Sequence, residues 1–277
     1  MGRSADGPPI SAPVTDRRPR GGLIAVLWWP YAVVRTLYCW IALAILTVGL
    51  AMVYIPSAAI GPNSRLVNAF ERFWVWFILR GSNVDLRSHG LENVVVGQSY
   101  IVMANHRSMY DIPALHYLLG KNRDLRWIGK HEMLRVPFFG WAFALSRHIA
   151  IDRQNRNKSI AALKEAAANS AEGVSFVIMP EGTRSLDGRL APFKKGGFHL
   201  AIDTSLPILP VAIMGTEQLM RKGEWWILPG SIDVFVRPPV EVGDYDKSRL
   251  EEFRQRVWTD ICDALPDLPA EAESGAA

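Results

Sequence analysis

The chain has 277 residues, of which 49% are hydrophobic and 21% charged, and its formal net charge is +4. This composition excludes a disordered chain, and two cysteines, Cys39 and Cys262, are too few for a disulfide scaffold or a cysteine-based metal centre. At roughly 100–200 residues per domain, the length allows one large domain with a smaller segment attached. Ten tryptophans and a mean hydropathy of +0.07 indicate more apolar surface than a soluble enzyme needs.

The apolar excess lies near the amino terminus. Residues 1–22 are rich in proline, glycine and arginine without periodicity, which predicts a disordered basic arm. Leu37–Ile55 is then almost unbroken apolar sequence, and as a helix it would span about 28 Å, close to the hydrocarbon core of a bilayer. A membrane-anchoring helical segment is therefore expected over residues 23–80. The alternatives are a buried core helix and a cleaved signal peptide, but the long polar arm before the run disfavours the second.

A second apolar piece, Leu66–Arg80, carries three polar residues on one helical face: Asn68, Glu71 and Arg72. This pattern fits an interfacial helix, the return leg of a helical hairpin, or a core helix of the following domain. Arginines just before the first apolar run favour a cytoplasmic amino terminus. They are Arg17, Arg18 and Arg20.

From residue 81 onward, short β-rich runs alternate with helical ones. Strands are predicted at residues 84–88, 100–103, 126–128, 149–151, 174–179, 208–213 and 232–236. The clearest helices are predicted at residues 157–171 and 247–265. This alternation predicts an α/β catalytic domain over residues 81–265, with ligands at the carboxyl ends of the strands. The acidic residues 266–277 are expected to form a disordered tail.

A histidine and an aspartate follow one of these strands. Residues 100–103 run directly into Asn105 and His106, and Asp111 comes shortly after. On a straight helix His106 and Asp111 would lie about 140° apart, so they meet only where the chain turns. There the carboxylate can hold one imidazole nitrogen and leave the other free as a base. Asn105 is either a further hydrogen-bonding group or a turn former.

A second group of polar residues follows the strand at residues 174–179. Residues 180–184, Pro-Glu-Gly-Thr-Arg, offer backbone donors, a hydroxyl and a guanidinium, all suited to a phosphate. Lys195 stands at the start of a predicted helix, another feature that favours anions. Lys130 and Arg153 follow two further strands, so parallel strands would bring these cations to one edge of the sheet.

These motifs carry a family resemblance. Asn105-His106 with Asp111 resembles the N-H-x-x-x-x-D box of the glycerolipid acyltransferases, and residues 180–184 resemble their second signature. Residues 185–188 continue it as in the 1-acylglycerol-3-phosphate acyltransferase branch. The remaining boxes also match: Lys130 with Val136-Pro137 and Gly140, Ile151-Asp152-Arg153, and the run at residues 207–211. The resemblance covers roughly residues 83–240, and Met179, where the family usually has an aromatic residue, departs from it.

The resemblance implies a mixed sheet flanked by helices, as in glycerol-3-phosphate acyltransferase, and an O-acyltransferase activity. It implies that His106 is the general base, which deprotonates the sn-2 hydroxyl of 1-acylglycerol-3-phosphate, and that Asp111 orients it. The donor would be an acyl thioester, acyl-CoA or acyl carrier protein, and no metal or redox cofactor is needed. The expected substrate-binding residues are Asn105, Lys130, Arg153, Glu181, Gly182, Thr183, Arg184 and Lys195.

The expected partners are the lipid bilayer, a lysophospholipid acceptor and the acyl donor, with no nucleic acid. A cytosolic donor and a cytoplasmic amino terminus favour a hairpin over residues 22–80 that enters the inner membrane and returns, with a short second leg that dips in. Three other functions stay open. They are acyl transfer or transacylation to another lysolipid such as lyso-ornithine lipid, non-catalytic lipid binding, and hydrolysis, which the lack of a G-x-S-x-G motif disfavours.

Overall fold

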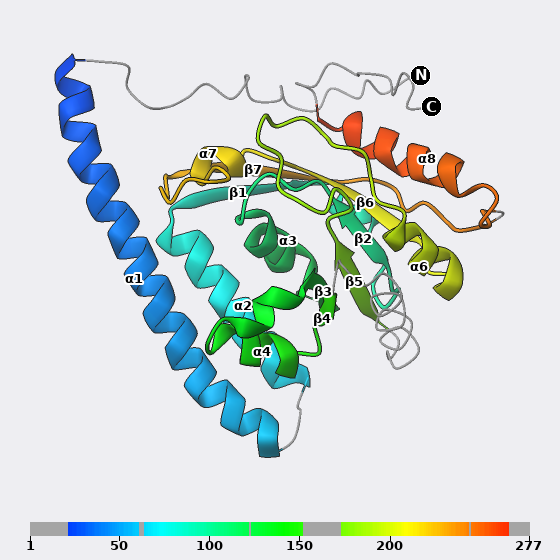
Figure 1. The fold of residues 1–277 in the computed structure, drawn as a ribbon, viewed down its shortest axis with the longest axis horizontal. Coiled ribbons are helices and arrows are strands. Elements are labelled where there is room, and N and C mark those ends of the chain that lie inside the picture. The colour runs from blue at the N-terminus through cyan, green and yellow to red at the C-terminus, as the bar shows by residue number, and fades with distance from the viewer. Residues whose placement is uncertain (1–21, 61–63, 122, 152–172, 244, 266–277) are drawn as a thin grey trace.

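The computed structural model describes residues 22–60, 64–121, 123–151, 173–243 and 245–265. Within these residues, strands form a seven-stranded sheet in the order β1-β7-β6-β2-β5-β3-β4 (Figure 1). The strands are β1 (Val84–His89), β2 (Ile101–Ala104), β3 (Asp124–Lys130), β4 (Ile149–Ile151), β5 (Val174–Ile178), β6 (Ile208–Met214) and β7 (Gly230–Val236). All seven predicted strands are confirmed, with ends that differ by at most two residues.

The sheet is mixed. Strands β6, β2, β5, β3 and β4 run parallel to one another. Strand β7 is antiparallel to β6, and β1 pairs in parallel with β7. The central strands β2 and β6 are buried along their whole length, as their continuous apolar sequences require of strands covered on both faces. The carboxyl ends of the five parallel strands therefore share one edge, as the sequence predicted.

Helices cover both faces of the sheet (Figure 1). On one face, α3 (Asp111–Leu119) packs around Tyr100 and Val102, with α4 (Phe139–Leu145) and the 3₁₀ turns at Leu91–Asn93 and His131–Arg135 nearby. On the other face, α6 (Gly196–Thr204) and α8 (Leu250–Cys262) enclose Ile101 and Met103. The predicted helix at 247–265 is thus confirmed with shorter ends. The predicted helix at 157–171, the arm up to residue 21 and the tail from residue 266 lie outside the described residues.

The first apolar run forms one long helix, α1 (Gly22–Ile60), that extends along the side of the domain (Figure 1). It is long and apolar enough to cross a membrane between Trp28 and Pro56. One side of α1 is buried against the domain and includes Thr36 and Tyr54. The other side is exposed and apolar: Val34 is 67% exposed and Ile45 is 69% exposed.

The second apolar piece forms α2 (Ser64–Gly81), which packs on both α1 and α3. Its polar face does not point to solvent at Glu71. That carboxylate lies 3.6 Å from His116 Nε2 of α3 and 3.3 Å from His148 Nε2 just before β4. Helix α2 therefore contributes to the core of the domain, which is one of the three interpretations that its sequence allowed.

Candidate active site

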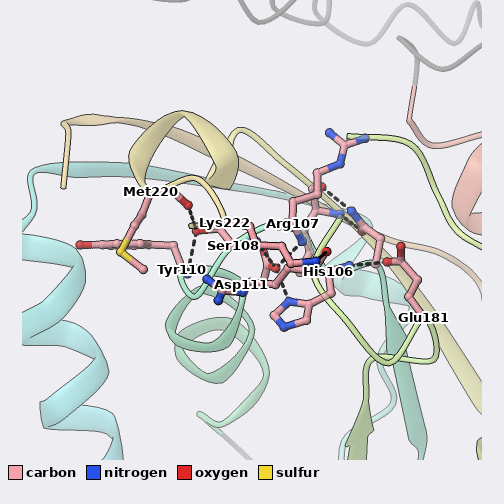
Figure 2. Close-up of polar contacts among 11 residues, drawn as sticks. His106, Arg107, Ser108, Tyr110, Asp111, Glu181, Met220 and Lys222 are labelled. Atoms are coloured by element: carbon pink, nitrogen blue, oxygen red, sulfur yellow. Dashed lines mark hydrogen bonds and ion pairs between the residues drawn. The ribbon is translucent and has the colours of Figure 1, made fainter. Parts of the chain in front are cut away.

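The turn after β2 brings the His106 and Asp111 side chains together at the carboxyl edge of the sheet (Figure 2). The distance from His106 Nδ1 to Asp111 Oδ2 is 2.7 Å. The same oxygen accepts the backbone N–H groups of Arg107 and Ser108, each at 2.8 Å. Asp111 is the first residue of α3, where a carboxylate is favoured by the helix dipole and by unpaired N–H groups.

These contacts fix the orientation of the imidazole. The Asp111 side chain is fully buried, whereas the His106 side chain is 16% exposed. An ionised carboxylate only accepts hydrogen bonds, so it favours the imidazole tautomer with a proton on Nδ1. The other ring nitrogen, Nε2, is then an acceptor, and it has no hydrogen-bond partner among the described residues. A partly exposed imidazole held in this way can act as a general base.

The backbone of His106 is held by the loop after β5 (Figure 2). Glu181 Oε1 accepts the His106 N–H at 2.6 Å, and Glu181 Oε2 accepts the Ala191 N–H at 3.1 Å. The Ser185 N–H donates to the His106 carbonyl at 2.7 Å. Glu181 is buried, and this burial raises its pKa to about 7 although the two backbone hydrogen bonds act in the opposite direction. Glu181 therefore positions His106 rather than pairing with a cation.

The rest of this loop has a defined backbone geometry. Gly182 has a φ of +75°, which side-chain-bearing residues rarely adopt, and a Cβ there would lie 2.8 Å from Lys194 Nζ. Thr183 Oγ1 and the Arg184 carbonyl each accept a hydrogen bond from Lys222, at 3.2 Å and 2.7 Å. Arg184 itself is partly exposed, so its guanidinium can reach a ligand in solvent.

The other predicted residues fall into three groups. Lys130 is exposed at the carboxyl end of β3, on the same sheet edge as His106. Asn105 is buried and fastens β2 to β6, because its amide donates to the Ile213 carbonyl and accepts the Ile213 N–H. Lys195 precedes α6 and pairs with Glu251 of α8 at 3.4 Å, on the opposite layer. Arg153 lies outside the described residues.

Sequence reasoning missed the segment after α7 (Thr216–Leu219). Ser108 Oγ donates to the Met220 carbonyl at 2.8 Å, and Lys222 reaches the loop after β5 (Figure 2). These contacts join residues 112 and 38 positions apart in the chain. The segment matches none of the family boxes, so no local pattern in the sequence points to it.

The fold and the His–Asp site define an α/β acyltransferase, and comparisons with known proteins agree. An acyltransferase family model matches residues 85–214. The chain is 30% identical over 242 residues to a 1-acyl-sn-glycerol-3-phosphate acyltransferase of Cocos nucifera, covering 85% of this chain and 76% of that protein. It is 31% identical over 207 residues to the Pseudomonas aeruginosa enzyme of the same name, covering 73% of this chain and 77% of that enzyme.

A solved structure is similar as well. The crystal structure of the 1-acyl-sn-glycerophosphate (LPA) acyltransferase PlsC from Thermotoga maritima superposes with a TM-score of 0.73 at 26% identity. The match covers 89% of this chain and 99% of that one. This chain therefore belongs to the 1-acyl-sn-glycerol-3-phosphate acyltransferase family, and it is an O-acyltransferase. The family and the mixed, helix-flanked sheet expected from the sequence are both confirmed.

Proposed function

We propose that this protein is a membrane-bound enzyme that transfers a fatty acyl group from an acyl thioester to the sn-2 hydroxyl of 1-acylglycerol-3-phosphate. The product is phosphatidic acid. The observation that carries the proposal is the 2.7 Å contact between His106 Nδ1 and a buried Asp111 carboxylate, which leaves His106 Nε2 available as a base. The names of the relatives support the same reaction.

The reaction proceeds in two proton transfers through one nitrogen. His106 Nε2 takes the proton of the sn-2 hydroxyl as its oxygen attacks the thioester carbonyl carbon. The tetrahedral intermediate then breaks its C–S bond, and the leaving thiolate takes the proton back from His106. Asp111 stabilises the imidazolium that exists between these steps. A thioester is already activated, so the protein needs no covalent acyl intermediate, metal ion or redox cofactor for this route.

The acceptor phosphate needs cations close to this base. Arg184 lies in the loop that holds His106, and its planar guanidinium can bind two phosphate oxygens. Lys130 supplies a second positive charge on the same edge of the sheet. The donor is acyl-CoA or acyl carrier protein, which a direct comparison of the two thioesters would distinguish.

The exposed apolar side of α1 supports attachment to the inner membrane, with the catalytic domain in the cytoplasm. Tyr54 of α1 accepts a hydrogen bond from Ser146 Oγ beside α4, and Trp40 donates to the Trp225 carbonyl. Because α1 is held at both places, it lies against the domain rather than projecting away from it. In this arrangement α1 enters the bilayer through its exposed apolar side, and α2, which packs on α1 and α3, returns the chain to the domain. Single cysteines at positions 12 and 270, in a cysteine-free background, would be labelled from the same side of vesicles; opposite sides would refute the hairpin.

The reaction is tested with purified protein in lipid vesicles. The acceptors are 1-acylglycerol-3-phosphate, glycerol-3-phosphate and a phosphate-free lysolipid, and we expect transfer to the first. The His106→Ala variant should lose about 10³-fold in kcat, a typical loss for a general base. His89→Ala is the matched control, because His89 also contacts a carboxylate, Asp233, at 3.1 Å on β7. Preference for a phosphate-free acceptor, or an active His106→Ala enzyme, would contradict the proposal.

A further inference from the structure

A loop between α7 and β7 joins the membrane-facing helix to the catalytic turn. We call residues 220–228 the anchor loop. At its start, the Met220 carbonyl accepts a hydrogen bond from Ser108 Oγ at 2.8 Å. Near its end, the buried Ile227 N–H donates to Thr36 Oγ1 of α1 at 3.1 Å. The anchor loop is therefore fastened both to the His106–Asp111 turn and to α1.

Lys222 of the anchor loop contacts the loop after β5 (Figure 2). Lys222 Nζ donates to Thr183 Oγ1 at 3.2 Å and to the Arg184 carbonyl at 2.7 Å. Both acceptors are neutral, and no carboxylate lies within 4.0 Å of this nitrogen among the described residues. An ammonium group has three N–H donors, so one donor and the full positive charge remain for a ligand.

Arg107 and Lys195 differ from Lys222 because each has an acidic partner. Arg107 is buried and pairs with Glu217 at 3.5 Å. Lys195 pairs with Glu251 at 3.4 Å. In both cases an acidic partner offsets most of the attraction for an anion. Lys222 is half-buried and has no such partner, so its charge acts more strongly on a neighbouring phosphate than a fully hydrated lysine would.

The chemistry of the acceptor sets where its phosphate must bind. In 1-acylglycerol-3-phosphate the reacting hydroxyl and the phosphate are on neighbouring carbons. A hydroxyl at His106 Nε2 therefore brings the phosphate close to the loops that surround His106. Lys222 contacts residues 183 and 184, and the next residue, Ser185, donates its N–H to the His106 carbonyl at 2.7 Å.

We propose that Lys222 is a specificity-determining residue that binds the phosphate of the acceptor with its unpaired ammonium charge, placed there by the anchor loop. This inference rests on the proposed function. Lys222 is a cation that lies outside every motif of the family resemblance. The same loop is attached to α1 through the Ile227 N–H.

The test compares Lys222→Ala, Lys222→Arg and Arg221→Ala with the wild-type enzyme. Lys222→Ala should raise the KM for 1-acylglycerol-3-phosphate about tenfold, the effect of one lost charge-assisted hydrogen bond, with kcat within about threefold. Lys222→Arg should recover most of the affinity because it keeps the charge. Arg221 is the matched control: it is exposed and adjacent on the anchor loop, so its loss removes the same charge without the contacts to the Thr183 hydroxyl and the Arg184 carbonyl.

A binding measurement separates this proposal from the proposed function. The dissociation constants of 1-acylglycerol-3-phosphate and of 1-acylglycerol are measured in detergent micelles, where no turnover is needed. Lys222→Ala should weaken binding of the phosphate-bearing lipid about tenfold and leave the other unchanged. Unchanged binding of the phosphate-bearing lipid, or an equal loss in Arg221→Ala, would overturn the proposal. If the wild-type enzyme transfers no acyl group to this acceptor, the proposed function fails, while micelle binding still decides the role of Lys222.

Discussion

Replacing Asp111 by asparagine removes a charge from the site with little change in shape. Asp111 Oδ2 accepts three hydrogen bonds, from His106 Nδ1 and from the N–H groups of Arg107 and Ser108. The amide oxygen of an asparagine can take the place of Oδ2 and keep all three. Its NH₂ group then occupies the position of Oδ1, which is buried and has no hydrogen-bond partner. The variant therefore retains the imidazole geometry but buries one unsatisfied donor.

The expected loss of activity follows from the lost charge. Two unit charges about 4 Å apart interact by about 4 kcal/mol at an effective dielectric constant of about 20, and solvent screens little because Asp111 is fully buried. The imidazolium forms only as the hydroxyl loses its proton, so this stabilisation belongs to the transition state. A loss of about 4 kcal/mol lowers kcat about 10³-fold. The unsatisfied donor costs about 1–3 kcal/mol of stability, which lowers Tm by a few degrees.

The assay measures kcat and KM of Asp111→Asn at saturating donor, together with a thermal melt. KM for the acceptor should stay within about threefold because Asp111 is buried behind His106 and does not reach the substrate. Asp233→Asn is the matched control, since it alters the partly buried His89–Asp233 pair on β1 and β7. A folded Asp111→Asn enzyme that keeps more than a tenth of the wild-type kcat would refute the electrostatic role of the carboxylate.

Two further predictions concern stability and the anchor loop. Burial raises the pKa of Glu181 from 4.5 to about 7, so the native state gains about 3 kcal/mol as the pH falls through this range, and Glu181→Gln removes the gain. Burial lowers the pKa of His116 from 6.5 to about 4. The native state therefore loses about 3 kcal/mol of stability as the pH falls from 6.5 to 4, and His116→Gln removes this loss. The free energy of unfolding in urea is measured from pH 4 to 8. Relative to the wild type, the two variants should change its slope against pH in opposite directions, and slopes equal to that of the wild type would contradict both assignments. Thr36→Val leaves the buried Ile227 N–H without its acceptor, so trypsin should cut the anchor loop faster than in the wild type, and unchanged cleavage would show that this bond does not hold the loop.

The elements of the fold were predictable because their signals are local. Strands such as β6 are continuous apolar runs between turns, and α8 repeats apolar residues at helical spacing. The surroundings of α2 were not predictable in the same way. Its polar residue Glu71 looks solvent-facing in the sequence, but two histidines from α3 and the start of β4 meet it across the fold. A contact between distant segments leaves no periodicity in either one.

In the candidate site, too, local contacts were predictable and contacts between distant segments were not. His106 and Asp111 lie within one turn, so their contact required only that the chain bend after β2, and it does. Glu181 was expected to bind the substrate, whereas its carboxylate accepts the His106 N–H, because the loop after β5 packs against the turn after β2. Lys222 and Met220 come from the anchor loop, whose position is set by α1 and β7. Their roles arise only once the tertiary contacts exist.

These contacts make α1 a structural part of the domain. Arg35 is buried and donates a hydrogen bond to the Ser82 carbonyl at the junction of α2 and β1. Thr36 satisfies the Ile227 N–H, and its side chain is fully buried. A fragment that began at residue 81 would leave the Ser82 carbonyl and the Ile227 N–H without these partners. It would also expose the apolar surface that α1 and α2 cover, and each change costs stability. Helix α1 therefore also supports the anchor loop, from which Lys222 contacts Thr183 and Arg184.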